Sequence, residues 1–195
     1  MTKFKCGKQS FRLENPPTIS AWASVAGKKE AQGPLSKYFD ITVTDSYLGQ
    51  KTWEQAEKRM QQIALQRLLQ KAGIRSAQVG AVLSGDLLNQ CIGSSFTLRN
   101  TGIPHIGLYG ACSTMAESLM LSSMLVGGGF SDNVVAMTSS HFASSERQYR
   151  FPLGYGGQRT PTSQWTVTGA GAALVTSEGK GPKITACTVG AVTDF

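Results

Sequence analysis

The sequence predicts an α/β fold with a largely parallel sheet, and three observations predict it. Short apolar runs typical of strands alternate along the chain with segments of helical periodicity. The clearest helix covers residues 53–72, and buried strands are expected at 79–83 and 133–138. A second helix, at 113–126, carries almost no charge, which is typical of a helix covered on most of its faces.

Composition limits the classes of protein to consider. The 195 residues suffice for one sizeable domain, and a charged fraction of only 16% leaves little room for disordered tails. The formal net charge of +7 suits anionic lipid headgroups, small dicarboxylates or nucleic acid as partners. The basic residues form no arm, and no RNA-recognition, helix-turn-helix or zinc-finger pattern is present. We therefore expect no nucleic-acid partner.

The four cysteines point to a reduced compartment. Cys6, Cys91, Cys112 and Cys187 stand at neither metal-ligand nor redox spacing, so no metal site is expected. The first residues lack the apolar core of a signal peptide, which favours a cytosolic site of synthesis. No run of 18 apolar residues occurs, so no membrane-spanning helix is expected.

The first third of the chain contains short strands and then the best-defined helix. Strands are expected at 18–25 and 41–44. Thr52 with Gln55 forms a capping box at the start of the helix 53–72, and Gly73 is a typical helix stop. The apolar positions of this helix define one buried face; the other face is expected to be wet and carries Glu54, Glu57, Lys58, Arg59 and Gln62.

The middle of the chain alternates buried strands with turns. The strand 79–83 ends in a turn that contains Asp86, and an apolar stretch at 103–108 precedes a break and the charge-poor helix 113–126. The strand 133–138 runs into Ser139 and His141.

A loop of about 25 residues, rich in arginines and aromatics, is expected after His141, and loops of this length are usually functional or lie at an interface. Strands are expected at 169–176 and 184–192.

Cys112 is the sharpest chemical feature. It stands where a strand turns into the buried helix, so unpaired backbone N–H groups and the positive end of the helix dipole would face its sulfur. Such a position favours thiolate, or an anionic ligand in its place. A buried structural thiol is an equally good interpretation of the same position.

A nucleophilic cysteine needs a base, and the chain offers two histidines. His105 follows Pro104 and is interpreted as a turn or core histidine. His141 and Asp86 each follow a strand end, where α/β folds place ligands, and each could equally be structural. The glycines at 169 and 171 lack the third glycine of a dinucleotide fingerprint and no Walker A motif is present, so no cofactor is expected.

Read together, the segments HIGLYGACSTMAESLMLSSMLV, DNVVAMTSSH and WTVTGAGAALVTSEG resemble the thiolase superfamily. They look like its cysteine helix, the strand that follows, and its glycine-rich strand. The resemblance implies two similar halves in a five-layer αβαβα arrangement, with a mixed, mostly parallel sheet in each half and the cysteine helix buried centrally. Residues 1–195 would be the N-terminal half, and the acid-base histidine of the enzymes would come from the half that this chain does not include.

Three further segments resemble the stage V sporulation protein AD family of spore formers. They are KQSFRLENPPTISAWASVAGKKEAQGPL, LSGDLLNQCIGSSFTLRN and the stretch SSHFASSERQYRFPLGYGGQRTPTSQWTVTGAGAALV. The resemblance implies a non-catalytic protein that binds dipicolinic acid, alone or as its calcium chelate, for uptake into the developing spore. It also implies peripheral attachment to the spore inner membrane, with the channel proteins of the stage V sporulation A group as partners.

The resemblance places Asp86, Cys112, Ser139 and His141 at the ligand pocket, with Cys112 matching the acylated cysteine of the enzymes. It also implies a homodimer that pairs through the strand 133–138. Two other functions stay open: an acyltransferase of the thiolase or ketoacyl-synthase type that uses Cys112, and a scaffold for membrane channel subunits.

Overall fold

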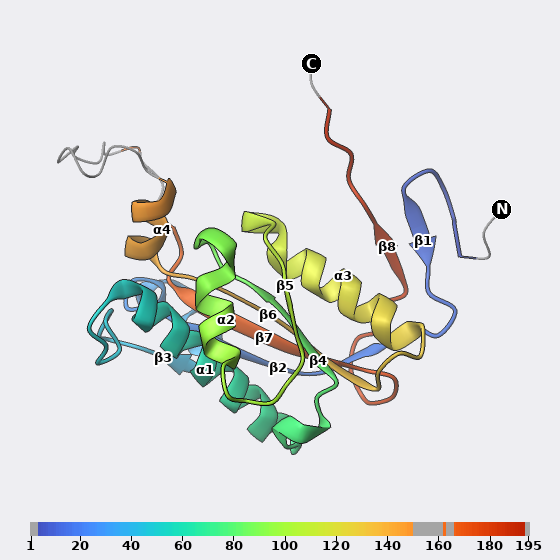
Figure 1. Ribbon diagram of the computed structural model, residues 1–195, viewed down its shortest axis with the longest axis horizontal. Helices are drawn as coiled ribbons and strands as arrows, with labels where there is room; N and C mark the ends of the chain where they lie inside the picture. Colours follow the sequence, from blue (N-terminus) through green and yellow to red (C-terminus); the bar gives the residue numbers. More distant parts are fainter. Residues whose placement is uncertain (1–3, 150–161, 163–165, 194–195) are drawn as a thin grey trace.

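The fold is a three-layer α/β/α arrangement around a six-stranded mixed sheet (Figure 1). A computed structural model describes residues 4–149, 162 and 166–193, with the side chains of 146–149 left out. The strands of the sheet, in spatial order, are β3 (Ile41–Thr42), β2 (Thr18–Ala26), β7 (Gly169–Thr176), β6 (Asn133–Ser140), β4 (Ala81–Gly85) and β5 (His105–Gly107).

The sheet is mixed because β7 runs against both of its neighbours. Strands β6, β4 and β5 are parallel to one another, and β3 is parallel to β2. Strand β7 pairs antiparallel with β2 on one side and with β6 on the other. The predicted α/β class and the mixed sheet are confirmed.

Helices cover both faces of this sheet. Helices α1 (Trp53–Ala72) and α2 (Ile92–Leu98) pack on one face, and α3 (Thr114–Gly127) packs on the other (Figure 1). Helix α4 (Phe142–Tyr149) follows β6 directly and contacts α1. Short 3₁₀ turns at 30–32, 36–38, 76–78, 89–91 and 111–113 complete the connections.

Helix α1 begins and ends where its sequence predicts. The hydroxyl of Thr52 accepts the backbone N–H of Gln55 at 3.2 Å, and the Gln55 side chain accepts the N–H of Lys51 at 3.3 Å. Gly73 adopts φ +67°, a left-handed conformation that glycine takes without the steric cost of a Cβ atom. A cap of this kind stabilises a helix by about 1 kcal/mol.

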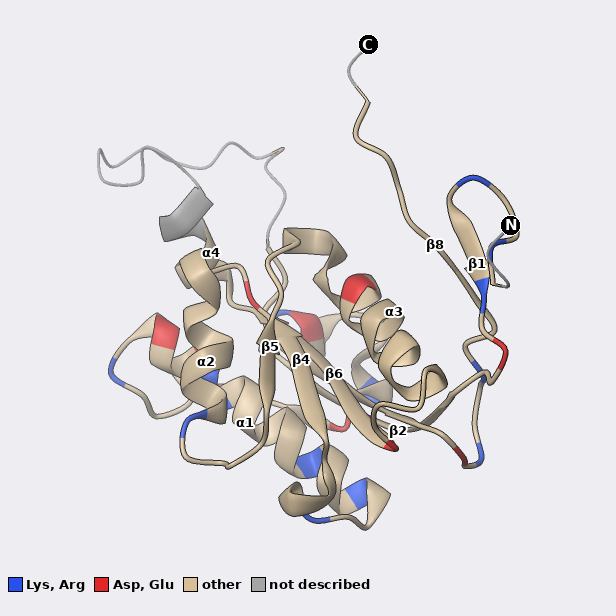
Figure 2. Ribbon diagram, turned by 45° about the vertical axis from the view of Figure 1, so that its right-hand side comes forward, with Lys and Arg blue, Asp and Glu red and all other residues tan. Residues whose placement is uncertain are grey.

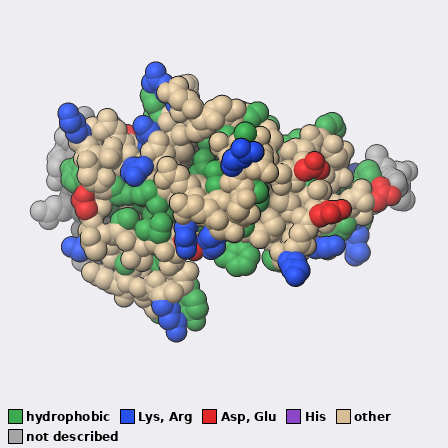
Figure 3. All heavy atoms as spheres, turned by 90° about the horizontal axis from the view of Figure 1, so that it is seen from below, with side chains coloured by type: hydrophobic (Ala, Val, Ile, Leu, Met, Phe, Trp, Pro, Cys, Tyr) green, Lys and Arg blue, Asp and Glu red, His purple; other side chains and the backbone are tan. Residues whose placement is uncertain are grey.

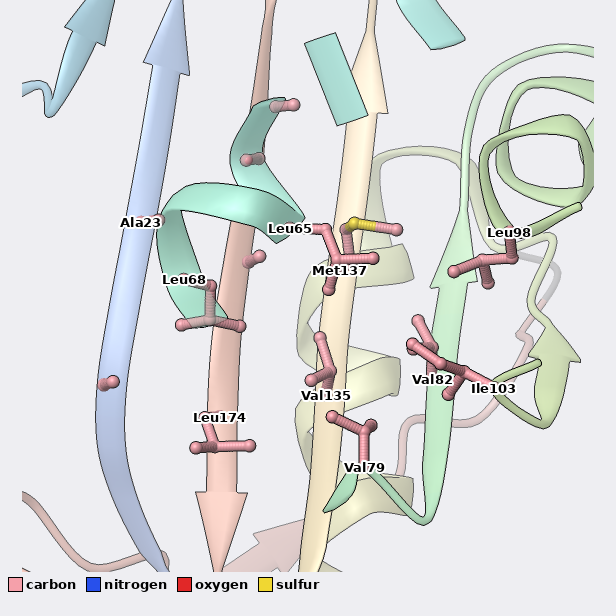
Figure 4. Close-up of a cluster of buried hydrophobic side chains, with 14 of the residues drawn as sticks. Ala23, Leu65, Leu68, Val79, Val82, Leu98, Ile103, Val135, Met137 and Leu174 are labelled. Carbon is pink, nitrogen blue, oxygen red and sulfur yellow. The ribbon is translucent and has the colours of Figure 1, made fainter. Parts of the chain in front are cut away.

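Two apolar clusters hold the layers together. The larger lies between α1 and the sheet and is built from residues such as Leu68, Val82, Val135, Met137 and Leu174 (Figure 4). The smaller lies between the sheet and α3, and it includes Leu83, Val134 and Val175. Because neighbouring strand residues point to opposite faces, β6 sends Val135 to α1 and Val134 to α3. Buried apolar area on both faces therefore fixes the register of the sheet.

The buried side of α3 carries small side chains. Ser118, Ser122 and Ser123 are fully buried, and their small side chains let the helix lie close to β4 and β6. The hydroxyls of Ser118 and Ser123 are satisfied there, because they donate to carbonyl oxygens one turn back, at 2.9 and 2.6 Å.

Several segments differ from the expectation. The strand expected at 79–83 is β4 at 81–85, and the stretch expected at 103–108 forms a strand only at 105–107. Of the residues 184–192, only β8 (Ala186–Thr188) is a strand, and it pairs with β1 (Ser10–Arg12) in a separate ribbon that projects from the body (Figure 1). Helix α2 was not predicted, because its short sequence IGSSFTL has too few positions to show a helical period.

Two expectations about the chain after β5 need correction. The first turns of the expected 25-residue loop are helix α4, and residues 150–161 and 163–165 of that loop lie outside the described part. The strand 133–138, expected at a dimer edge, lies inside the sheet, where β4 and β7 take the hydrogen bonds on both of its sides. It cannot pair with a second copy while this sheet is intact.

Basic residues are distributed over several elements of the described part (Figure 2). Lys and Arg are spread over the ribbon, the loops and α1 (Figure 2), and basic side chains alternate with apolar ones on the face seen from below (Figure 3). Within the described ranges, no helix is both long enough and apolar enough to cross a bilayer.

Candidate functional site

Cys112 lies in a tight turn between β5 and α3. It is exposed and belongs to the 3₁₀ turn Ala111–Ser113, directly before α3 begins at Thr114. Ala111 adopts φ +48°, a left-handed conformation that costs a residue with a Cβ atom roughly 1–2 kcal/mol. The turn is held by the Ser113 hydroxyl, which donates to the carbonyl of Gly110 at 2.7 Å. The strained turn presents the thiol at the surface instead of burying it.

A glycine on the neighbouring strand makes this turn possible. A Cβ atom at Gly85 would lie 2.1 Å from the carbonyl oxygen of Leu108 and 2.6 Å from the Thr114 methyl. The end of β4 and the start of α3 therefore approach as closely as backbone allows, which sets the position of the Cys112 turn over the sheet.

Cys112 lines a cavity with a volume of about 780 Å³. The cavity opens over the ends of β2, β6 and β7, and its lining combines apolar side chains with hydroxyls. The apolar group includes Val25, Phe39, Leu87, Met115 and Val167, and the hydroxyl group includes Ser24, Thr138, Ser139, Ser140, Ser145 and Thr168. Glu30 is the charged side chain among the described lining residues. An apolar slot with several hydroxyls suits a small, flat organic ligand.

Ser139 connects the cavity to a buried polar network. Its hydroxyl donates to Oε1 of Glu57 at 2.9 Å and accepts from the Gln61 amide at 2.7 Å. The same amide reaches the Ser94 hydroxyl at 3.1 Å. The second carboxylate oxygen of Glu57 accepts the hydroxyl of Ser144, from α4, at 2.6 Å. The network thus ties α1 to β6, α2 and α4.

Asp86 anchors the start of α2. One of its carboxylate oxygens accepts the backbone N–H and the hydroxyl of Ser94, both at 2.7 Å, and the other accepts the N–H of Leu88 at 3.0 Å. Asp86 is only 1% exposed, and its side chain does not line the cavity. These contacts give it a structural role; its predicted contact with a ligand stays a prediction.

His141 is also fully buried. Its Nε2 lies 2.9 Å from the carbonyl oxygen of Ser46, and its Nδ1 accepts the N–H of Ala143 at 3.2 Å. This pairing requires the neutral ring with the proton on Nε2. Burial lowers the pKa of His141, against the opposing effect of the Ser46 carbonyl. His141 stacks on Phe142 and packs against Trp53 behind the cavity, so the structure does not bring it to the wall where Cys112 lies.

His105 has structural contacts, as expected from its sequence position. It begins β5, and its Nε2 lies 3.0 Å from the Ser84 hydroxyl. Burial lowers its pKa as well. Of the four predicted site residues, the structure brings Cys112 and Ser139 to one cavity and leaves Asp86 and His141 behind its wall.

Glu57 is the site residue that the sequence interpretation missed. The expectation that it lies on the wet face of α1 is wrong, since it is fully buried. Burial raises its pKa to about 7, the hydrogen bonds from Ser144 and Ser139 oppose that rise, and the charges of Asp86 and Glu54 add to it. The signal was present in the spacing, because Glu57 lies three residues before Met60 and seven before Ala64, on the buried stripe.

The fold places this protein in a known structural class. The 3-oxoacyl-[acyl-carrier-protein] synthase III of Aquifex aeolicus superposes with a TM-score of 0.54 at 16% identity, over 82% of this chain and 53% of that one. OleA of Xanthomonas campestris, in a structure with lauric acid and lauroyl-CoA, gives a TM-score of 0.54 at 12% identity, over 83% of this chain and 56% of that one. The chain therefore has a thiolase-like fold.

Sequence comparison then gives the family. The family model for stage V sporulation protein AD (SpoVAD) matches residues 7–195. The stage V sporulation protein AD of Bacillus subtilis is 40% identical over 189 residues, which is 97% of this chain and 56% of that protein. The chain belongs to the stage V sporulation protein AD family, and it spans about half the length of this curated relative. Its expected place as the N-terminal half of a two-half fold stays a prediction.

Proposed function

We propose that this protein binds dipicolinic acid, alone or as its calcium chelate, at the cavity beside Cys112. Membership of a sporulation family supports the ligand, and the cavity of about 780 Å³ at Cys112 is the observation that carries the site. Pyridine-2,6-dicarboxylate is a flat ring with two carboxylates, so it needs an apolar slot and donors for anionic oxygens.

The cavity supports both requirements. Met115 and Val167 supply apolar surface for the ring, and Thr138 adds a hydroxyl to the lining of the same cavity. The net charge of +7 favours the approach of an anion. Glu30 would oppose a free dianion at this wall, and bound calcium would offset that repulsion, since Ca²⁺ takes carboxylate oxygens as ligands. Among the described residues, no group of three acidic, histidine or cysteine side chains is placed to hold a metal ion.

Calorimetric titration of the intact protein with dipicolinate, with and without calcium, tests the proposal. Saturable heat with one site per chain is the expected result. No heat in either titration contradicts it.

An acyltransferase that uses Cys112 is the second candidate, because the thiol is exposed in a cavity on a thiolase-like fold. A nucleophilic thiol needs a base, and both histidines of this chain are engaged in structural hydrogen bonds. We therefore favour binding over catalysis. Intact-mass measurement after incubation with an acyl-CoA separates the two.

We further propose a homodimer that pairs through β5. This strand lies at the end of the sheet and has β4 as its one neighbour within the described part. Apolar side chains surround it: Ile92, Phe96, Ile106 and Tyr109 are each 45–50% exposed. An open strand flanked by exposed apolar side chains is suited to pairing with a second copy. We also propose that the protein attaches to membrane channel proteins at the spore inner membrane. Membership of the family is the only support for this attachment.

A further inference from the structure

The carboxylate of Glu57 lies directly behind the wall of the cavity. Its Oε1 is bonded to Ser139, which lines the cavity, and its Oε2 is bonded to Ser144, the neighbour of the lining residue Ser145. Glu57 is fully buried, so water does not screen its charge from the cavity.

The charges around Glu57 are negative. Within the described part, the two charges that act on it are Asp86, which follows β4, and Glu54, on α1 itself. Among the described side chains of β6 and α4, the hydroxyls of Ser139 and Ser144 bond to it, and α2 adds the Ser94 hydroxyl to the same network. Among the described residues no cation acts on this buried carboxylate, which favours its protonation, and its pKa of about 7 agrees with this arrangement.

The network can hold Glu57 in either protonation state. The Ser144 hydroxyl lies 2.6 Å from Oε2 of Glu57 and 3.1 Å from the carbonyl oxygen of His141, and its single proton serves one of them at a time. With Glu57 ionised, Ser144 donates to the carboxylate. With Glu57 protonated, its O–H donates to Ser144 Oγ, and the Ser144 proton turns to the His141 carbonyl. No buried group loses its partner in this exchange.

We propose that Glu57 takes up one proton from solvent when an anionic ligand enters the adjacent cavity. The ligand carboxylates and the Glu57 carboxylate repel each other across a water-poor wall, and protonation of Glu57 removes one of the two charges. Glu57 is thus a positioning residue that makes anion binding dependent on pH. The inference rests on the proposed function for the identity of the anion.

The test is calorimetry with dipicolinate on the intact protein in two buffers of different ionisation enthalpy. Above pH 7 the wild type is expected to take up close to one proton per ligand, and its affinity falls by up to about tenfold per pH unit. Glu57→Gln keeps the shape and carries no charge, so it binds without proton uptake and with an affinity that does not change with pH. Glu178→Gln removes an exposed carboxylate that is not among the charges acting on Glu57, and it keeps the behaviour of the wild type.

The outcomes separate this inference from the proposed function. Binding to the wild type without proton uptake, or equal uptake in wild type and Glu57→Gln, overturns the inference and leaves dipicolinate binding in place. No binding at any pH overturns both.

If Glu57→Gln does not fold, Ser144→Ala provides a second test of the inference. Loss of this donor raises the Glu57 pKa further, so proton uptake extends to higher pH. An unchanged pH profile in Ser144→Ala counts against the inference. Infrared titration of the protonated carboxyl band that Glu57→Gln removes adds a readout in the free protein, and a Glu57 that is still ionised at about pH 6 overturns the inference.

Discussion

The Nε2 atom of His141 lies 2.9 Å from the carbonyl oxygen of Ser46, and this contact fastens the end of β6 to the loop before α1. The two residues are far apart in sequence, and the ring that joins them is completely buried. The histidine therefore acts as a neutral structural link between the end of β6 and the loop before α1.

Replacement of His141 by Ala is expected to reduce the free energy of unfolding by about 2–4 kcal/mol, because it leaves a cavity and an unpaired Ser46 carbonyl. Urea denaturation measures this loss. His105→Ala, at a half-buried ring with one side-chain contact, is the matched control and should lose less. Equal losses in the two variants would show that the contact with Ser46 adds nothing to the free energy of unfolding beyond the burial of a histidine ring.

Glu57 should make the wild-type protein less stable as the pH rises. Its pKa is raised from 4.5 to about 7, so its stabilising effect is complete below about pH 4.5 and is lost as the pH rises to about 7. The shift corresponds to about 3 kcal/mol. Glu57→Gln is therefore expected to gain stability relative to wild type between these pH values. Denaturation of both proteins across the range measures the difference, and a constant difference speaks against a buried, titrating Glu57.

A large side chain at Gly171 should block the ligand site. Gly171 lines the cavity from β7, and a Cβ atom there would meet no other atom within 4 Å. Gly171→Phe is expected to fill the cavity and abolish dipicolinate binding without unfolding the sheet, since strands favour aromatic residues over glycine. Gly171→Ala, which adds one methyl group, should reduce affinity much less. If Gly171→Phe still binds dipicolinate, the ligand binds at a site other than this cavity.

Cys112 should form no stable thioester with short acyl-CoA substrates. The histidines of this chain that could serve as its base are held in structural hydrogen bonds. Intact-mass spectrometry after incubation checks this expectation, with Cys112→Ser as the control for labelling at the other three cysteines. An acyl mass on wild type that is missing in Cys112→Ser would establish the acyltransferase alternative.

A charge on the open edge of the sheet should prevent the proposed dimer. Ile106→Lys and Phe96→Lys each place a cation in the apolar surface around β5, and sedimentation velocity should then show monomers. Leu35→Lys changes a side chain that is 60% exposed, near the opposite end of the sheet, and should remain dimeric. A wild-type monomer at micromolar concentration would contradict the dimer itself.

Local signals in the sequence determined much of this structure. Thr52, Gln55 and Gly73 fixed the ends of α1, because capping needs residues within one turn of each other. The strand 169–176 matched its prediction, since its apolar run has glycine at one end and a turn sequence at the other. The turn that carries Cys112 was located correctly before the charge-poor helix. The expectation that this helix is covered on most of its faces is not met in the described part, where the buried residues of α3 are Thr114, Ser118, Ser122, Ser123 and Val126.

Tertiary structure decided which polar residues reach the cavity. Asp86 and His141 follow strand ends, as ligand residues in α/β folds do, yet their hydrogen-bond partners come from α2 and from the loop before α1. Glu57 carries a charge, and its sequence context does not reveal that serines from β6 and α4 will satisfy it in the interior. The order of the strands likewise placed β6 inside the sheet and β5 at its edge. Partners distant in sequence decide these features, because burial and hydrogen bonding depend on the segments that meet in space.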